Sequence, residues 1–164
     1  IGRTGMGVHA MKLQPGDELI DMSRLEEGQQ ILAITTGGYG KRTDPDQYRE
    51  QGRNGMGIRA MALTDRTGEL AAQLAVYENE DIMLITDDGT IIRMAVSDIR
   101  ESGRNTQGVR LMRLSEGAKI VGVARAEQEE PDEADEAAFE EAVAKMTDET
   151  ETVVDGSDGG DEEI

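Results

Sequence analysis

The chain has 164 residues, contains no cysteine and carries a formal net charge of −18. Without cysteine it can form neither disulfides nor thiolate metal sites, and a single histidine, His9, cannot by itself build a zinc site or a catalytic triad. No apolar stretch approaches the roughly 20 residues of a membrane-spanning helix, and the N-terminus lacks the pattern of a signal peptide. We therefore expect a cytoplasmic protein with no membrane partner.

The negative charge is concentrated at the C-terminal end. Residues 127–164 contain 17 acidic residues and one base, Lys145, whereas residues 1–126 contain 18 acids against 16 Lys and Arg. The sequence thus predicts two parts, a nearly neutral, Arg-rich body (1–126) and an acidic, largely disordered tail (127–164). Within the tail, Phe139, Val143 and Met146 fall at the spacing of a short helix.

A repeat is the strongest pattern in the body. The motif Gly-Arg-x-x-x-Gly-[Val/Ile]-x-x-Met-x-Leu occurs three times, beginning at Gly2, Gly52 and Gly103. A fixed period of about 50 residues is typical of propeller and solenoid proteins, in which each repeat is one structural unit. We expect the repeated glycines to be structural, because they permit positive φ or a close approach of strands.

Each repeat divides into short apolar runs separated by turn residues. In the second repeat, residues 58–63, 70–77, 81–86 and 90–96 are predicted strands, and Asp87-Asp88-Gly89 is a predicted hairpin turn. Four strands in about 50 residues is the size of one propeller blade. The third repeat adds only one further apolar run, residues 119–125. The predicted fold class is therefore all-β, with about two and a half propeller-like blades that start near residues 1, 52 and 103.

Three runs resemble a known family. These are residues 103–109 (GRNTQGV), residues 39–43 (YGKRT) and residues 82–87 (IMLITD) followed by Gly89-Thr90. They resemble the last blades of the C-terminal domain of the DNA gyrase A subunit. The resemblance implies a six-bladed β-pinwheel whose neighbouring blades exchange strands. It also implies a function, the wrapping of double-stranded DNA in support of ATP-dependent negative supercoiling by a type II topoisomerase.

The resemblance also implies partners and limits. The expected partners are double-stranded DNA, the gyrase B subunit in an A2B2 assembly, and the rest of the gyrase A subunit, in the bacterial cytoplasm near the nucleoid. ATP and Mg²⁺ are used elsewhere in the whole enzyme, so we expect no cofactor in this fragment. The family's basic box and the catalytic tyrosine are absent, so the fragment by itself is not expected to be an enzyme. The equivalent domain of the topoisomerase IV A subunit is the nearest alternative.

DNA wrapping requires positive charge arrayed along a curved rim, with contacts to phosphates rather than to bases. Our candidate DNA-binding residues are Lys41, Arg42, Arg53, Arg93 and Arg104, and a second group comprises Arg49, Arg59, Arg100, Arg110 and Arg113. We expect Lys41, Arg42 and Arg93 to project to one outer face, because they follow equivalent hairpins. The arginines of the repeat motif have an equally good structural interpretation, in which they bond carbonyl groups where repeats meet.

A different class of function is a protein-interaction scaffold built from the same blades. Salt dependence separates the two hypotheses, because binding through phosphate contacts weakens steeply with added salt and apolar docking does not. We interpret the acidic clusters near Asp44, Glu78 and Asp87 as charged hairpin tips rather than calcium or catalytic sites, since no EF-hand pattern is present.

Overall fold

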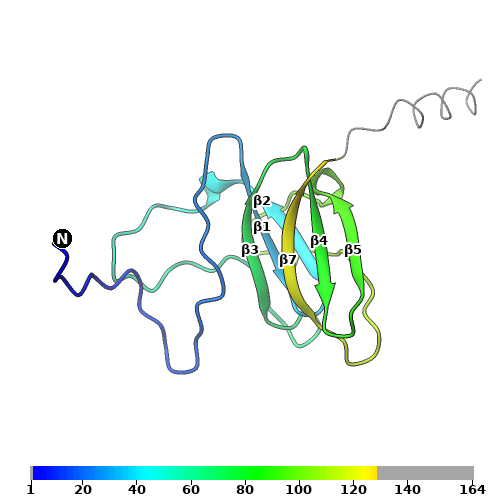
Figure 1. Cartoon of the computed structure of the whole chain (residues 1–164), viewed down its shortest axis with the longest axis horizontal. Helices are drawn as coiled ribbons and strands as arrows, with labels where there is room; N and C mark the ends of the chain where they lie inside the picture. Colours follow the sequence, from blue (N-terminus) through cyan, green and yellow to red (C-terminus); the bar gives the residue numbers. More distant parts are fainter. Residues whose placement is uncertain (1, 129–164) are drawn as a thin grey trace, which may run out of the picture. The chain divides into compact units, whose positions relative to one another are not determined.

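The described part of the chain, residues 2–128 of a computed structural model, is built from strands (Figure 1). Within these residues the only helical elements are two 3-10 turns, η1 (Pro45–Gln47) and η2 (Val96–Asp98), each three residues long. The all-β prediction is therefore confirmed. Ile1 and residues 129–164 lie outside the described part, so the predictions for the acidic tail stay predictions.

The first sheet has the strand order β3-β1-β2-β6. Its centre is the hairpin of β1 (Gln30–Thr35) and β2 (Tyr39–Thr43), which are antiparallel and joined by a turn in which Gly38 has a φ of 81°. The outer strands come from later repeats, β3 (Leu70–Val76) from the second and β6 (Val109–Arg110) from the third. A single sheet therefore draws on all three repeats.

The second sheet has the order β5-β4-β7. Here the hairpin is β4 (Glu80–Thr86) and β5 (Ile91–Ala95), with the predicted turn at residues 87–89 and a φ of 86° at Gly89. The third strand, β7 (Ile120–Glu127), comes from the third repeat and corresponds to the predicted run at residues 119–125. The strands predicted at 70–77, 81–86 and 90–96 are confirmed as β3, β4 and β5.

The two sheets follow one construction rule. Each hairpin pairs with a strand of the next repeat, and the pairing begins at equivalent residues, Thr35 with Leu70 and Thr86 with Ile120. The register also shifts at the same place in both, just before these threonines. Strand exchange between blades, which only the family resemblance implied, is thus present in the structure.

A shared apolar core holds the two sheets together. Inward-facing residues of β1, β3, β4 and β7 join Val96 and Ile99 in one cluster, whose fully buried members are Leu32, Ile34, Val76, Ile82, Leu84, Val96, Ile99 and Ile120. Burying an aliphatic side chain of this size contributes about 1.5–3 kcal/mol relative to leaving it exposed. The strands β3 and β7 lie where the sheets adjoin (Figure 1), and Arg125 of β7 donates a hydrogen bond to the carbonyl of Ala75 in β3 at 3.1 Å.

The repeat motif forms the contacts between successive repeats. The amide of Lys12 donates to the carbonyl of Gly55 at 2.8 Å, and the equivalent amide of Ala62 donates to the carbonyl of Thr106 at 3.0 Å. The second glycine of each motif has a positive φ: 83° at Gly7, 77° at Gly57 and 74° at Gly108. Side chains other than glycine rarely adopt this conformation, so the structural interpretation of these three glycines is confirmed.

One predicted strand is wrong. Residues 58–63 form no strand and pair with none of the strands among residues 2–128, and a bend lies at Met61. Their counterpart in the third repeat, β6, pairs with β2 of a hairpin two repeats earlier. Strand formation at this position depends on a neighbouring hairpin, and the local sequence cannot supply one.

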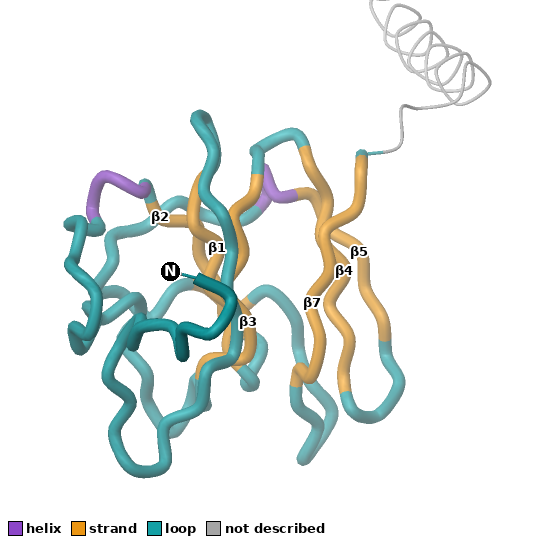
Figure 2. The backbone as a smooth tube through the Cα atoms, turned by 60° about the vertical axis from the view of Figure 1, so that its left-hand side comes forward, coloured by secondary structure: helices purple, strands orange, loops and turns teal. Residues whose placement is uncertain are grey.

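The N-terminal segment, residues 2–28, lies outside both sheets and runs as loop (Figure 2). Leu19 precedes Leu70 by one repeat and so occupies the position at which β3 begins. The segment nevertheless exposes its apolar side chains: Met6, Val8, Met11, Leu13, Leu19, Ile20, Met22 and Leu25. Its sequence resembles that of the exchanged strands β3 and β7, but it pairs with no hairpin among the described residues.

Candidate nucleic-acid interface

Lys41 lies in the interior. Its side chain is completely buried, and its ammonium nitrogen Nζ donates to the carbonyls of Gly103 and Arg104, both at 2.7 Å. Burial, assisted by the nearby charge of Arg104, lowers the pKa of Lys41 from 10.5 to about 8. The prediction that Lys41 projects to an outer face is therefore wrong: the lysine fastens the motif turn of the third repeat to the first hairpin.

Arg42 is also buried, with only 6% of its surface exposed. Its guanidinium donates to the carbonyl of Ile99 at 2.6 Å, to the amide oxygen of Gln30 at 2.9 Å and to the carboxylate of Glu78 at 3.1 Å. These bonds tie β2 to the loop that follows η2. The predicted outward projection of Arg42 is wrong for the same reason as for Lys41, because every residue of β2 is buried.

Arg93 is the structural equivalent of Arg42, as the hairpin alignment predicted. Arg93 forms an ion pair with Asp81 at 2.7 Å. The equivalent contact in the first hairpin joins Arg42 to Gln30, because Gln30 occupies there the position that Asp81 occupies in the second hairpin. The other contacts of Arg93 include the carbonyl of Glu127 in β7, also at 2.7 Å. The side chain of Arg93 keeps 34% of its surface exposed, so it reaches solvent while it joins three strands.

The motif arginines divide between the two interpretations. Arg104 donates to the carbonyl of Arg59 in the preceding repeat at 2.6 Å, and its backbone amide donates to the side chain of Gln47 at 2.9 Å. This is the structural role at a repeat junction. Arg53 is exposed and has no hydrogen bond or ion pair with the rest of residues 2–128, so of the five candidates it is the one whose charge is fully open to solvent.

A basic cluster that sequence reasoning missed lies at the end of the first hairpin. Arg66 and Arg110 both donate to the phenol oxygen of Tyr39, at 2.6 and 2.9 Å, and each guanidinium carbon lies 5.4 Å from the centre of the tyrosine ring. Arg110 belongs only to the second group of candidates, and no sequence pattern points to Arg66. The direct pairing of Tyr39 with Arg110 between β2 and β6 creates the cluster, and that pairing has no local sequence signal.

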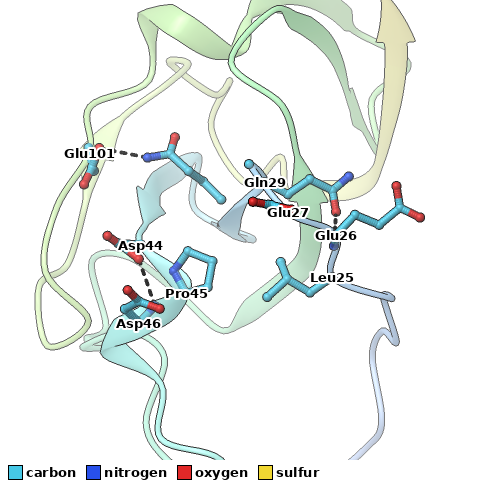
Figure 3. A pocket seen from close by; sticks show the side chains of 10 residues that line it. Leu25, Glu26, Glu27, Gln29, Asp44, Pro45, Asp46 and Glu101 are labelled. Atoms are coloured by element: carbon cyan, nitrogen blue, oxygen red, sulfur yellow. Dashed lines mark hydrogen bonds between the residues drawn. The ribbon is translucent and has the colours of Figure 1, made fainter.

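A hollow beside the first hairpin has the opposite charge. A pocket of about 520 Å³ lies between that hairpin and the N-terminal segment, and five carboxylates line it: Glu26, Glu27, Asp44, Asp46 and Glu101 (Figure 3). Glu101 accepts a hydrogen bond from Gln30 at 2.8 Å, and Asp44 caps η1 by accepting from the amide of Asp46, also at 2.8 Å. Such a surface repels a phosphate. Among the described residues, no three His, Asp or Glu side chains are placed so that together they could hold a metal ion, and no helix could span a membrane.

Strand-exchanged hairpins repeated about every 50 residues define a propeller-like blade protein. A family model described as the DNA gyrase C-terminal domain, beta-propeller, matches residues 1–26, 29–73 and 80–127. The chain belongs to this family, as a partial gyrase A C-terminal pinwheel domain.

Curated relatives support the same assignment. The chain is 40% identical over 158 residues to the A subunit of DNA gyrase from Streptomyces coelicolor, with 92% of the chain aligned to 18% of that protein. It is 43% identical over 128 residues to the same subunit of Pseudomonas aeruginosa, with 78% of the chain aligned to 14% of the relative. The Staphylococcus aureus protein is 38% identical over 138 residues. The chain spans less than a fifth of the length of these relatives.

Solved structures show the same fold. The structure of a DNA gyrase A C-terminal domain matches with a TM-score of 0.69 and 25% identity, over 73% of this chain and 41% of the other. The C-terminal domain of DNA topoisomerase IV matches with the same TM-score and 23% identity, over 83% of this chain and 43% of the other.

Proposed function

We propose that this chain is a DNA-binding part of the wrapping domain of a gyrase-type protein, and that it acts in the negative supercoiling of DNA by the whole, ATP-dependent enzyme. The observation that carries the proposal is the match to gyrase A relatives along residues 1–127, together with the strand-exchanged hairpins. The relatives at 38–43% identity are gyrase subunits, which favours gyrase over topoisomerase IV.

The mechanism follows from charge on the described surface. Arg53, Arg66, Arg93 and Arg110 reach solvent, whereas Lys41, Arg42 and Arg104 hold the repeats together. The exposed arginines would neutralise backbone phosphates without reading bases, and many such contacts would offset the cost of bending the duplex. Lys41, Arg42 and Arg104 would keep the blades at a fixed spacing.

The rest of the expected assembly depends on this proposal. The partners are double-stranded DNA, the gyrase B subunit, and the remainder of the A subunit, in the bacterial cytoplasm. ATP and Mg²⁺ act in other parts of the enzyme. The contribution that we propose for residues 2–128 is to hold DNA.

The test is the binding of a fluorescent duplex to the full chain at several salt concentrations. Phosphate contacts predict that log affinity falls linearly with log salt, with a slope of about −0.9 for each phosphate neutralised. A flat salt response, or no binding even at low salt, would contradict the proposal. A flat response with saturable binding of a protein partner would favour the scaffold hypothesis instead.

A further inference from the structure

Three distant parts of the chain meet at the phenol oxygen of Tyr39. Tyr39 begins β2, Arg66 lies in the loop before β3, and Arg110 ends β6. Both arginines are exposed at the surface, whereas Tyr39 is only 6% exposed. An inner tyrosine therefore holds two outer guanidinium groups against one shared acceptor.

The two positive charges are not compensated by any acid in the described part of the chain. Arg42, Arg93 and Arg125 each lie within 4.0 Å of a carboxylate, but neither Arg66 nor Arg110 does. Like charges brought this close repel each other, and a bound anion removes the repulsion. The hydrogen bond from Arg110 lowers the pKa of Tyr39, which shows that the pair favours negative charge at this point.

The cluster retains most of its donors. A guanidinium has five N–H donors in a planar fork, and the phenol engages only Nε of Arg66 and Nη2 of Arg110. The remaining N–H groups have no hydrogen-bond partner among residues 2–128. Arginine forks match the geometry of phosphate oxygens.

Tyr39 holds the side chains of Arg66 and Arg110 in place before any ligand binds. Its backbone amide and carbonyl are both bonded to the hydroxyl of Thr35 at 3.3 Å, which anchors the hairpin turn. Long surface side chains normally lose conformational freedom when they bind a ligand, and groups already held in place lose less. The phenol holds the two arginines through hydrogen bonds, whereas a carboxylate at this position would cancel part of their charge.

The corresponding corner of the second sheet has the opposite character. Thr90 replaces Tyr39 in the second hairpin, where it makes the same backbone contact to Thr86. Glu116 lies four residues before Ile120, as Arg66 lies four residues before Leu70, and it lines a shallow hollow together with Asp87 and Asp88. The basic cluster is therefore particular to the first hairpin and is not a general consequence of the fold.

We propose that Arg66 and Arg110, positioned by Tyr39, form a clamp for one phosphodiester group of the backbone of double-stranded DNA. The choice of DNA as the ligand rests on the proposed function, whereas the clamp itself rests on the geometry of these three residues. Tyr39 is a positioning residue, and the two arginines make the contact.

The experiment measures duplex affinity against salt for the full chain and three variants. They are Arg66→Gln with Arg110→Gln, Tyr39→Phe alone, and a control, Lys12→Gln with Arg24→Gln, which removes two charges from the exposed N-terminal segment. Circular dichroism checks that each variant keeps its β-structure. If the double arginine variant fails to fold, the single variants Arg66→Gln and Arg110→Gln take its place.

The arginine variant is expected to bind roughly tenfold or more weakly, because charge-assisted bonds are lost, and its salt slope should be smaller by about one. Tyr39→Phe should weaken binding several-fold and keep the wild-type slope, because both charges remain. A purely structural tyrosine would not separate affinity from slope in this way. The proposal is overturned if the arginine variant matches the control in both affinity and slope while the wild type binds DNA.

Failure of the clamp and failure of the proposed function are distinguishable with a small probe. If the wild type binds no DNA, the proposed function fails, and NMR titration with dimethyl phosphate then tests the clamp by itself. Shifts of the side-chain Nε resonances of Arg66 and Arg110 that weaken in Tyr39→Phe would support the phosphodiester site. Absence of such shifts would overturn it.

Discussion

The ammonium group of Lys41 lies 2.7 Å from the carbonyl oxygen of Gly103, 62 positions further along the chain. Two motifs that the sequence presents separately, the YGKRT run and the Gly-Arg repeat, are thus parts of one junction. The charged ammonium group makes its hydrogen bonds inside the protein, where the side chain of Lys41 connects the first hairpin to the third repeat. This contact distinguishes the basic residues that hold the blades together from the basic residues that face solvent.

Replacing Lys41 with methionine should destabilise the fold and leave DNA contacts unchanged. The variant keeps the apolar stem, but the carbonyl of Arg104 loses the donor from Lys41, and the carbonyl of Gly103 keeps only its hydrogen bonds from Thr106. An acceptor left unsatisfied in the protein interior costs about 1–3 kcal/mol. Urea unfolding should show a loss of that order. The salt slope of DNA binding, measured on the folded variant, should equal that of the wild type. A reduced slope would place Lys41 at the DNA surface after all.

Lys41 also predicts how stability depends on pH. Its pKa is about 8 in the folded chain and 10.5 as the reference value. Between these values the unfolded chain holds a proton that the folded chain has released, so the free energy of unfolding should rise with pH across this window. The contribution is at most roughly 1.4 kcal/mol per pH unit. Unfolding curves from about pH 7.5 to about pH 10.5 should show this rise in the wild type and its absence in Lys41→Met; parallel curves would contradict it.

Gly108 should not tolerate a side chain. Its φ is 74°, and a Cβ atom at this position would collide with the carbonyl oxygen of Gly40. The backbone conformation alone costs an alanine about 1–2 kcal/mol, and the collision with β2 adds to it. Thermal unfolding of Gly108→Ala should therefore shift well below that of the wild type.

The matched control for this substitution is Gly52→Ala. Gly52 is the first glycine of the same motif, has no positive φ, and has no atom within 4 Å of where its Cβ would lie. Its melting temperature should stay close to that of the wild type. Equal destabilisation of both variants would mean that the motif's glycines are not distinguished by backbone conformation.

The acidic tail offers a prediction about regulation. A tethered polyanion has a high effective concentration near basic positions, so removing it should tighten DNA binding at low salt, and the gain should shrink as salt screens the charges. The truncation should begin at residue 129, because β7 runs to Glu127, whose carbonyl accepts a hydrogen bond from Arg93 at 2.7 Å. Unchanged binding at low and moderate salt would leave the tail a solubilising arm only.

The sequence alone determined the features that depend on neighbouring residues. The period of the Gly-Arg motif predicted repeated units, the short apolar runs between turn residues predicted β3, β4 and β5, and Asp88-Gly89 predicted the hairpin turn. The glycines with positive φ belong to the same class, because conformational freedom is a property of the residue itself. The strands, the turn and the glycines are each encoded within a few positions, and the recurrence of the motif showed that the unit they form is repeated.

Only the tertiary structure decided which basic side chains are exposed. The strand β2 carries Lys41 and Arg42 as a surface strand would, yet all five of its residues are buried, because it lies between β1 and β6 and beneath loops of later repeats. Arg66 and Arg110 meet Tyr39 across 27 and 71 positions of the chain. A long charged side chain can make hydrogen bonds inside a junction between repeats, or it can contact a ligand at the surface. Which role it takes depends on the strands brought against it, and here strand exchange brings them from other repeats.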